Sequence, residues 1–384
     1  MSTPTVHGGL ALISAALLSS VLGSVHAFSV FLEPLEAQFG ATRAMVSLTY
    51  SFALIALTAA VLSGGVIFAR WRPGPFLAGV GLIAALGALI AAAAPSLGVV
   101  WLGYSLLFGA ANGLGYGYGL QIAAQANPGR EGWAMGVVTA AYALGAALAP
   151  FGFVALTMAG GFAAAMTALA VVVAATAMVS ALLMARSGAV FQAPTPGATR
   201  TTIGMRSFVT LWIGYGASVA GGLMAIGHAA GVASSLGYQG PDWAAPSVIA
   251  VANLIGSLVG GRLVDLMRPL NLLSILPGMA AVALAAMALG GGAGMLFLFA
   301  VIGFTYGGVI AAYPAAILKA VGPAQSQIVY GKVFTAWGAA GLAAPWLAGA
   351  LFDVTDGYVA ALLVAAALAG LSALFARVGP FAER

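Results

Sequence analysis

Apolar residues occur along the chain in stretches of about twenty, separated by short segments that contain Arg, Pro, Gly or Asp. Such a stretch is long enough for an α-helix to cross the hydrocarbon core of a bilayer. Runs such as 91–95 and 171–175 do not alternate polar with apolar residues, which argues against a membrane β-barrel. We therefore predict an all-α membrane protein with twelve spans, at residues 9–34, 45–69, 75–95, 97–122, 133–156, 161–185, 206–236, 245–267, 271–290, 294–318, 327–350 and 357–377.

The longest polar stretch, residues 186–205, is rich in Ser, Thr, Pro and Gly and has six predicted spans on either side. Such a composition is typical of a linker. We predict an N-terminal six-helix bundle at 1–185, a cytoplasmic linker at 186–205 and a C-terminal six-helix bundle at 206–384.

The two halves of the chain repeat each other. Residues 64–73 read GGVIFARWRP and residues 260–269 read GGRLVDLMRP, an offset of 196. Because each half has an even number of spans, both halves enter the membrane in the same direction and form a parallel repeat. At an offset of 195, the matched residues are Pro128 and Pro323, Gly136 and Gly331, Pro150 and Pro345, Gly113 and Gly308, Tyr118 and Tyr313, and Tyr142 and Trp337.

Charge places the chain in the membrane and orients it. Only 5% of the residues are charged, against about 25% in soluble domains. With the N-terminus in the cytoplasm, eleven Lys and Arg residues lie on the inner side, as the positive-inside rule requires. The net charge of +5 therefore reflects topology and does not indicate nucleic acid. We predict a bacterial-type inner-membrane protein with both termini cytoplasmic. The inner basic residues are Arg70, Arg72, Arg130, Arg186, Arg200, Arg206, Arg262, Arg268, Lys319, Arg377 and Arg384.

Residue types argue against a cofactor and an enzyme. The chain has no Cys and three His that are not closely spaced, so we expect no metal site. It contains no Walker A motif, no dinucleotide-binding glycine pattern and no HExxH. We therefore expect neither a cofactor nor a catalytic constellation.

Polar residues are unevenly shared among the spans. The third, sixth, ninth and twelfth spans contain almost none, and the other eight hold nearly all the membrane-depth Tyr, Asn, His and Lys. Polar side chains inside a membrane face a wet cavity or the bundle interior. We therefore expect the four apolar spans to be peripheral and the other eight to surround one central cavity.

Lys332, His26 and His228 are the cationic candidates within the spans. Lys332 can bind a carboxylate or extend to the inner headgroups, and the sequence leaves both readings open. Either histidine can carry a coupling proton or be an interfacial side chain satisfied by backbone or water. Arg43 lies at the outer mouth, where we expect it to attract anions on entry.

Aromatic and amide side chains at mid-depth supply the remaining candidates. Tyrosine hydroxyls and indole N–H groups need partners there, and their rings can enclose a small planar solute or simply pack between helices. The amides can donate hydrogen bonds to a solute or join helices. The predicted substrate-binding set is Lys332, His228, Tyr118, Tyr142, Tyr313, Trp337, Tyr306, Asn112 and Asn253.

Three segments resemble the monocarboxylate-transporter and oxalate/formate-antiporter branch of the major facilitator superfamily. They are FGATRAMVSL at 39–48, YGKVFTAWGAAG at 330–341 and LAGALFDVTDGY at 347–358. Residues 260–269 also resemble the inner-loop signature of the superfamily, which implies a gate in which Asp265 pairs with Arg262 or Arg268, or caps a helix of the neighbouring half. The alternative is that the two arginines are only positive-inside flanking residues. Unlike many members of the branch, the eighth span here has no charge before Arg262.

The resemblance implies a monomeric secondary transporter that moves a small organic anion, monocarboxylate-like, by alternating access. Protons would be co-transported, or another anion exchanged. The alternative is an exporter of a neutral or weakly polar compound, as in drug-exporting relatives. The partners expected are the small-molecule substrate, protons and the lipid bilayer.

Overall fold

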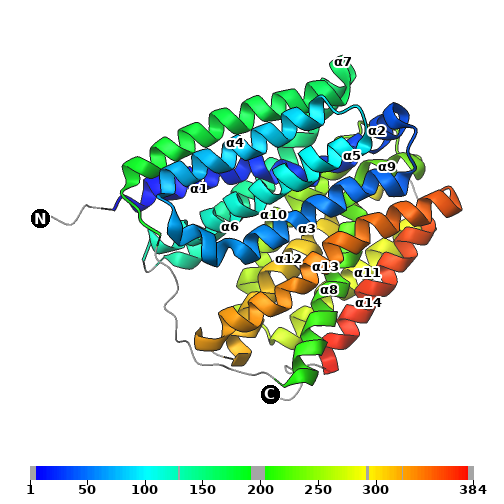
Figure 1. Cartoon of the computed structure of the whole chain (residues 1–384). Coiled ribbons are helices and arrows are strands. Elements are labelled where there is room, and N and C mark those ends of the chain that lie inside the picture. Colours follow the sequence, from blue (N-terminus) through cyan, green and yellow to red (C-terminus); the bar gives the residue numbers. More distant parts are fainter. Residues whose placement is uncertain (1–5, 129, 192–203, 291–293, 322, 379–384) are drawn as a thin grey trace, which may run out of the picture. The chain divides into compact units, whose positions relative to one another are not determined.

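The computed structural model describes residues 6–128, 130–191, 204–290, 294–321 and 323–378 (Figure 1). Within these ranges every regular element is a helix, which confirms the predicted all-α fold. Eleven helical stretches are long and apolar enough to cross a membrane, and one of these, Trp133–Ser187, has 55 residues. It is broken at Gly160–Gly161, where Gly161 has a φ of 70° that favours glycine. Counting its two parts separately gives the twelve predicted spans.

The chain divides into two compact units. Unit 1 comprises Met1–Gly40 and Phe52–Pro194, and unit 2 comprises Ala41–Ser51 and Thr195–Arg384. Most of the predicted linker, residues 192–203, lies outside the described residues. The short segment Ala41–Ser51 departs from a simple division into halves, because it counts with unit 2 although it precedes most of unit 1.

Unit 1 is built from the first six spans. Its helix α7 runs alongside both α1 and α4 (Figure 1). The elements are α1 (Gly8–Leu22), the 3₁₀-helix η1 (Gly23–Phe31), α2 (Leu32–Phe39), α3 (Arg43–Ile67), η2 (Phe68–Arg70), α4 (Pro73–Ala92), α5 (Leu97–Val100), the π-helical η3 (Trp101–Phe108), α6 (Gly109–Gln125) and α7 (Glu131–Ser187), where α3 begins in unit 2.

Unit 2 repeats this plan. Its main contacts are between α10 and α12, between α11 and α14, and between α8 and both α13 and α14. Pro269 opens α11 as Pro73 opens α4, a position where proline removes no helical hydrogen bond. The elements are α8 (Met205–Gly227), α9 (Ala229–Ser235), α10 (Ala244–Leu266), α11 (Pro269–Leu289), α12 (Met295–Val321), α13 (Pro323–Thr355) and α14 (Val359–Val378).

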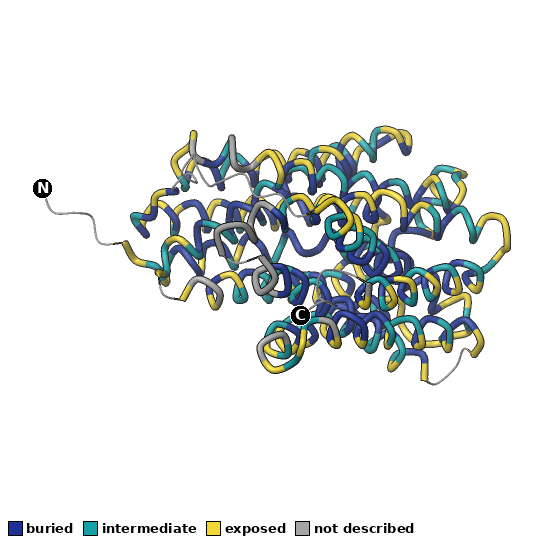
Figure 2. Tube along the Cα trace, turned by 90° about the horizontal axis from the view of Figure 1, so that it is seen from below, coloured by how far each residue is buried: buried dark blue, intermediate teal, exposed yellow. Residues whose placement is uncertain are grey.

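The apolar spans pair with one another inside each unit. The third span, α4, packs on α7, whose second part is the sixth span, and the ninth span, α11, packs on the twelfth, α14. Buried and exposed residues alternate along single helices, so each helix has a covered face and an exposed face (Figure 2). That these four helices lie outermost in the membrane remains a prediction.

Matched glycines bring equivalent helices close together in the two units. A Cβ atom at Gly113 of α6 would collide with the Leu57 carbonyl of α3, and one at Gly307 of α12 would collide with the Asn253 carbonyl of α10. Small residues at such crossings let helix backbones approach closely, which is how membrane helices gain van der Waals contact. The repeat seen in the sequence is therefore also a repeat of packing.

The packing register of α6 and α12 corrects two predicted matches, Gly113 with Gly308 and Tyr118 with Tyr313. Gly113 and Gly307 are 194 residues apart, one fewer than the offset that pairs Tyr118 with Tyr313. Tyr118 packs on Phe68 and Phe76, at the ends of the second and third spans, whereas Tyr313 packs on Tyr215 of α8. One residue turns a helix by about 100°, so the two tyrosines face different neighbours.

Candidate functional site

Asn112 is the centre of a polar cluster in unit 1. Its side chain is fully buried, and its Nδ2 donates to the Leu22 carbonyl at 2.6 Å, where α1 gives way to η1. The Tyr142 hydroxyl donates to Asn112 Oδ1 at 3.1 Å. The amide therefore uses both a donor and an acceptor, as a buried amide must to avoid a large desolvation cost. The sequence-predicted residues Asn112 and Tyr142 lie together in this cluster.

His26 and Tyr116 extend the unit 1 cluster on either side of Tyr142. The His26 ring meets Tyr142 edge-on at 5.5 Å, and the Tyr116 ring lies 4.5 Å from it, centroid to centroid. The hydroxyl oxygens of Tyr116 and Thr139 are 3.3 Å apart. Thr139 donates its own proton to the Met135 carbonyl, so Tyr116 is the donor to Thr139.

Trp337 and Tyr306 form the corresponding pair in unit 2. The Trp337 indole Nε1 donates to the Tyr306 hydroxyl at 3.0 Å, and the Phe334 ring stacks on Trp337 at 5.5 Å and 4°. A Cβ atom at Gly222 of α8 would collide with the Tyr306 ring, so this glycine provides the space for it. Tyr142 and Trp337, which the sequence repeat matches, thus make the same kind of contact. Tyr142 donates from the fifth span to the fourth, and Trp337 donates from the eleventh span to the tenth.

Tyr313 lies deeper in unit 2 than this pair. It is 2% exposed, and its ring centroid is 4.5 Å from that of Tyr215. A Cβ atom at Gly214 would lie 2.8 Å from the Tyr313 hydroxyl oxygen. Tyr215 also approaches Tyr330, with 6.5 Å between ring centroids, so an aromatic layer joins α8, α12 and α13.

Lys332 lies on the exposed side of α13, beside a second tryptophan. The Trp212 indole of α8 donates to Thr335 Oγ1 at 2.9 Å, and Thr335 donates to the Lys332 carbonyl at 2.7 Å. The Lys332 side chain is exposed, and among the residues the structure describes no carboxylate pairs with its ammonium group. We call Trp212, Lys332 and Thr335 the lysine patch.

His228 and Arg43 lie together in another part of unit 2. His228 is fully buried at the break between α8 and α9, and the Arg43 side chain is 6% exposed. Both contact the hydroxyl of Tyr358, with His228 Nδ1 at 2.9 Å and Arg43 Nη1 at 2.8 Å. The Arg43 guanidinium also lies 4.4 Å above the Phe352 ring. Neither cation is on an exposed surface of the chain.

The other predicted residues are dispersed. Tyr118 is fully buried among the rings of Phe68, Phe76 and Phe191, and its hydroxyl has no hydrogen-bond partner among the described residues. Asn253 is half-buried on α10, where it accepts from Ser257 at 3.4 Å.

Of the predicted gate, only the arginines can be placed. Arg262 and Arg268 are exposed, whereas the Asp265 side chain lies outside what the structure describes. The prediction that Asp265 closes an inner gate therefore stays a prediction.

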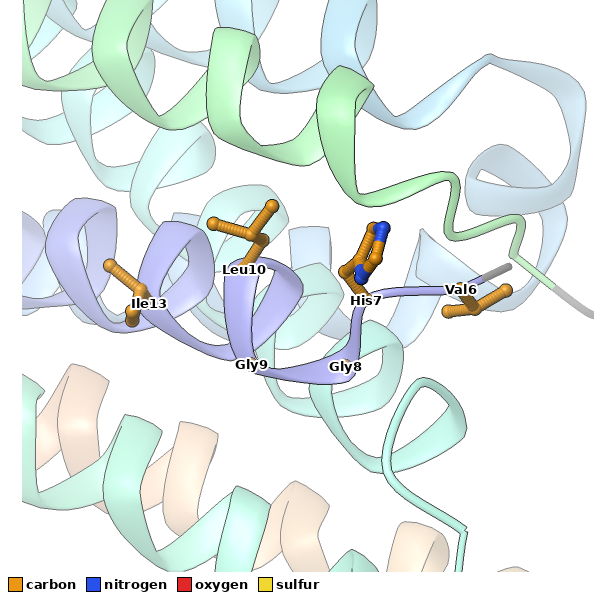
Figure 3. A pocket seen from close by; sticks show the side chains of 6 residues that line it. All are labelled: Val6, His7, Gly8, Gly9, Leu10 and Ile13. Carbon is orange, nitrogen blue, oxygen red and sulfur yellow. The ribbon is translucent and has the colours of Figure 1, made fainter. Parts of the chain in front are cut away.

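One open hollow of about 600 Å³ lies beside the first turn of α1 (Figure 3). Val6, Leu10 and Ile13 line it together with His7 and two glycines. It contains none of the predicted site residues. Across the described ranges, no group of three or more His, Asp or Glu side chains is placed to hold a metal ion.

Several partners in these clusters were not predicted from the sequence. Tyr116, Thr139 and Trp212 are polar or aromatic residues on the predicted cavity-lining spans, so the same polarity argument could have included them. Tyr358 and Asp353 contact residues about 310 positions earlier, and no local pattern indicates such a pairing.

The fold defines a polytopic helical membrane protein made of two repeated helical units. Residues 11–345 match the Major Facilitator Superfamily, and the chain belongs to this family of transporters. It is 26% identical over 344 residues to the uncharacterized MFS-type transporter YhjX of Escherichia coli K12, covering 86% of this chain and 84% of that protein.

Solved structures show the same fold at low sequence identity. A bacterial homologue of the human lysosomal transporter Spinster, inward-facing and unoccupied, superposes with a TM-score of 0.76 at 12% identity, covering 99% of this chain and 98% of that one. The partially occluded inward-open xylose transporter XylE of E. coli gives 0.71 at 14% identity, covering 96% and 98%.

Proposed function

We propose that this transporter moves a small organic anion, monocarboxylate-like, by alternating access, either with protons or in exchange for another anion. We further propose that it is a monomer in a bacterial-type inner membrane with both termini in the cytoplasm. The observation that carries the choice of an anion is the lysine patch.

A carboxylate at membrane depth needs a positive partner, because an unpaired charge there is expensive to desolvate. Among the cationic candidates of the spans, His228 and Arg43 are buried and bonded within unit 2, and His26 packs on Tyr142. Lys332 is the candidate whose side chain is exposed. Its position therefore supports it as the main charge partner of the anion.

The lysine patch brings an indole ring to the turn of α13 that carries Lys332. The indole N–H and the Thr335 hydroxyl proton are used within the patch, so the ammonium group supplies the donors for an anion. The Trp212 indole and the Thr335 hydroxyl lie on the helices of the seventh and eleventh spans, both of which we predict to line the cavity. An ammonium group on a flexible stem can follow a carboxylate over a short distance, because its four-carbon stem has many rotamers.

The experiment is uptake of labelled lactate, formate and oxalate into proteoliposomes, with and without an imposed pH gradient and with a counter-anion inside. We expect uptake of at least one carboxylate above that of protein-free vesicles. Stimulation by the pH gradient would indicate proton symport, and stimulation by the internal anion would indicate exchange. Efflux of apolar compounds without uptake of any carboxylate would overturn the proposal.

A further inference from the structure

Three residues of unit 2, His228, Asp353 and Tyr358, hold the first part of helix α3 through its own Arg43 and Ser47, and we call these five residues the clasp. The Asp353 carboxylate accepts from the backbone N–H groups of Arg43 at 2.9 Å and Ala44 at 2.8 Å. It thereby caps the N-terminus of α3, where a negative charge is stabilising. The segment Ala41–Ser51 counts with unit 2, and the rest of α3 counts with unit 1.

The hydrogen bonds of the clasp fix the tautomer of His228. Its Nε2 lies 2.8 Å from the Pro345 carbonyl, which can only accept, so Nε2 carries a proton. Ser47 Oγ is 3.2 Å from the same nitrogen and gives its own proton to the Arg43 carbonyl. In the neutral imidazole, Nδ1 is then an acceptor and receives the proton of the Tyr358 hydroxyl at 2.9 Å.

A continuous chain of donors results, from Arg43 Nη1 to the Tyr358 oxygen and from the Tyr358 hydroxyl to His228 Nδ1. A proton added to Nδ1 reverses the last link. Tyr358 would then accept from both cations and join two positive charges through one buried oxygen. Like charges in a buried site repel strongly, because little solvent screens them.

We infer that His228 is a proton-binding residue whose protonation releases the segment Ala41–Ser51 from the clasp. The charged and titratable groups around it are Arg43 on α3, Asp353 at the end of α13 and Tyr358 before α14. Asp353 is the acidic member, and its carboxylate is already engaged by the start of α3. The inference does not depend on the identity of the transported solute.

The clasp has no spare room, which makes its closed state testable by small substitutions. A Cβ atom at Gly231 would lie 2.8 Å from both Arg43 Nη1 and the Tyr358 hydroxyl oxygen. A Cβ atom at Gly349 would lie 2.7 Å from Ser47 Oγ and 2.9 Å from the Arg43 carbonyl oxygen. Gly231→Ala should therefore open the clasp without changing any titratable group.

The test is maleimide labelling of a single cysteine in substrate-free proteoliposomes, which is direct because the chain has no native Cys. Val46→Cys reports release, since Val46 is fully buried, and Thr42→Cys, at an exposed position in the same segment, normalises for the pH dependence of thiol chemistry. Lowering the pH from about 8 to about 4 covers the protonation of a histidine whose burial disfavours the charged imidazolium. We expect the normalised labelling of Val46→Cys to rise by roughly tenfold.

His228→Gln is the non-titrating variant, because its amide can donate to Pro345 and accept from Tyr358. Labelling in this variant should stay slow at every pH, whereas Gly231→Ala and Tyr358→Phe should label fast at every pH. An equal rise in His228→Gln, or no rise with His228 intact, would overturn the inference. Since no substrate is present, either result leaves the anion proposal to its own uptake assay.

Discussion

The matched pairs of the two units keep one geometry and differ in chemistry. In unit 1, Tyr142 of the fifth span donates to the amide of Asn112 in the fourth. In unit 2, Trp337 of the eleventh span donates to the phenol of Tyr306 in the tenth. The repeat has therefore retained a hydrogen bond between equivalent helices while an amide in one unit is replaced by an aromatic side chain in the other.

The two pairs also differ in what surrounds them within their own units. The unit 1 pair ties its amide to the backbone of α1, so it stiffens the start of η1. The unit 2 pair is enclosed by aromatic rings, and the exposed Lys332 lies on the same helix as Trp337.

The largest effect on stability should come from a substitution at a close helix–helix contact, and it should differ between the two units. A Cβ atom at Gly145 of α7 would collide with the Ser20 carbonyl of α1, whereas the residue 195 positions later, Ala340, already has one. Gly145→Ala should destabilise by about 3 kcal/mol or fail to insert, and Ala340→Gly should cost about 1 kcal/mol. Thermal unfolding in detergent measures both. Equal unfolding temperatures would show that the two contacts are equivalent after all.

Removing the amide should have the next largest effect. Asn112→Leu leaves the Leu22 carbonyl and the Tyr142 hydroxyl without their partner, and each unsatisfied buried group costs about 1–3 kcal/mol. Tyr306→Phe leaves the Trp337 indole without its acceptor, and the loss of this neutral hydrogen bond should cost less. If Tyr306→Phe unfolds at a lower temperature than Asn112→Leu, the assignment of the structural role to unit 1 is wrong.

A smaller effect should follow when each pair loses only its donor. Tyr142→Phe and Trp337→Phe each remove one hydrogen bond and should cost about 1 kcal/mol. The cycle of Tyr142→Phe with Asn112→Leu should show a coupling of about 1 kcal/mol, because the two side chains share that bond. Strictly additive unfolding free energies would argue that the pair is not coupled in the membrane protein.

The smallest effect should come from Tyr118. Its buried hydroxyl has no hydrogen-bond partner among the described residues, so Tyr118→Phe removes an unsatisfied group and keeps the ring packing. Stability should stay the same or rise by up to about 1 kcal/mol, and uptake should not change. A marked loss of uptake in Tyr118→Phe would restore Tyr118 as a substrate-binding residue.

The spans could be predicted from the sequence because apolar length alone determines them, and nearly every predicted span agrees with a helix to within a few residues. The rotation of each helix about its axis could not be predicted in this way, because the alternating Gly and Tyr residues of 113–119 allow more than one alignment of the two halves. One residue of register error turns a side chain by about 100°, so Tyr118 was matched with Tyr313 although their neighbours differ. The 3₁₀ stretch η1 and the break at His228 also lie inside predicted spans, where no proline or charged residue marks them.

The sequence predicted which residues could belong to the candidate site, but it did not predict which of them contact one another. Polarity at membrane depth pointed to Asn112, Tyr142, Tyr306 and Trp337, which the structure joins in two pairs, and their role in substrate binding stays a prediction. It also grouped His228 and Arg43 with possible anion partners, whereas they contact Tyr358 and Asp353 from distant parts of the chain. Such long-range contacts depend on how the units fold, which periodicity does not encode.

The most direct test of the central claim is carboxylate uptake by Lys332 variants in proteoliposomes, with Arg377→Gln as the control for the loss of an exposed charge at the end of α14. Lys332→Gln keeps much of the stem and its polarity, so folding and insertion should be unchanged while uptake is abolished. Lys332→Arg should only impair uptake, since it keeps the charge but changes the geometry. Normal uptake by Lys332→Gln would contradict the account and identify Lys332 as a headgroup anchor.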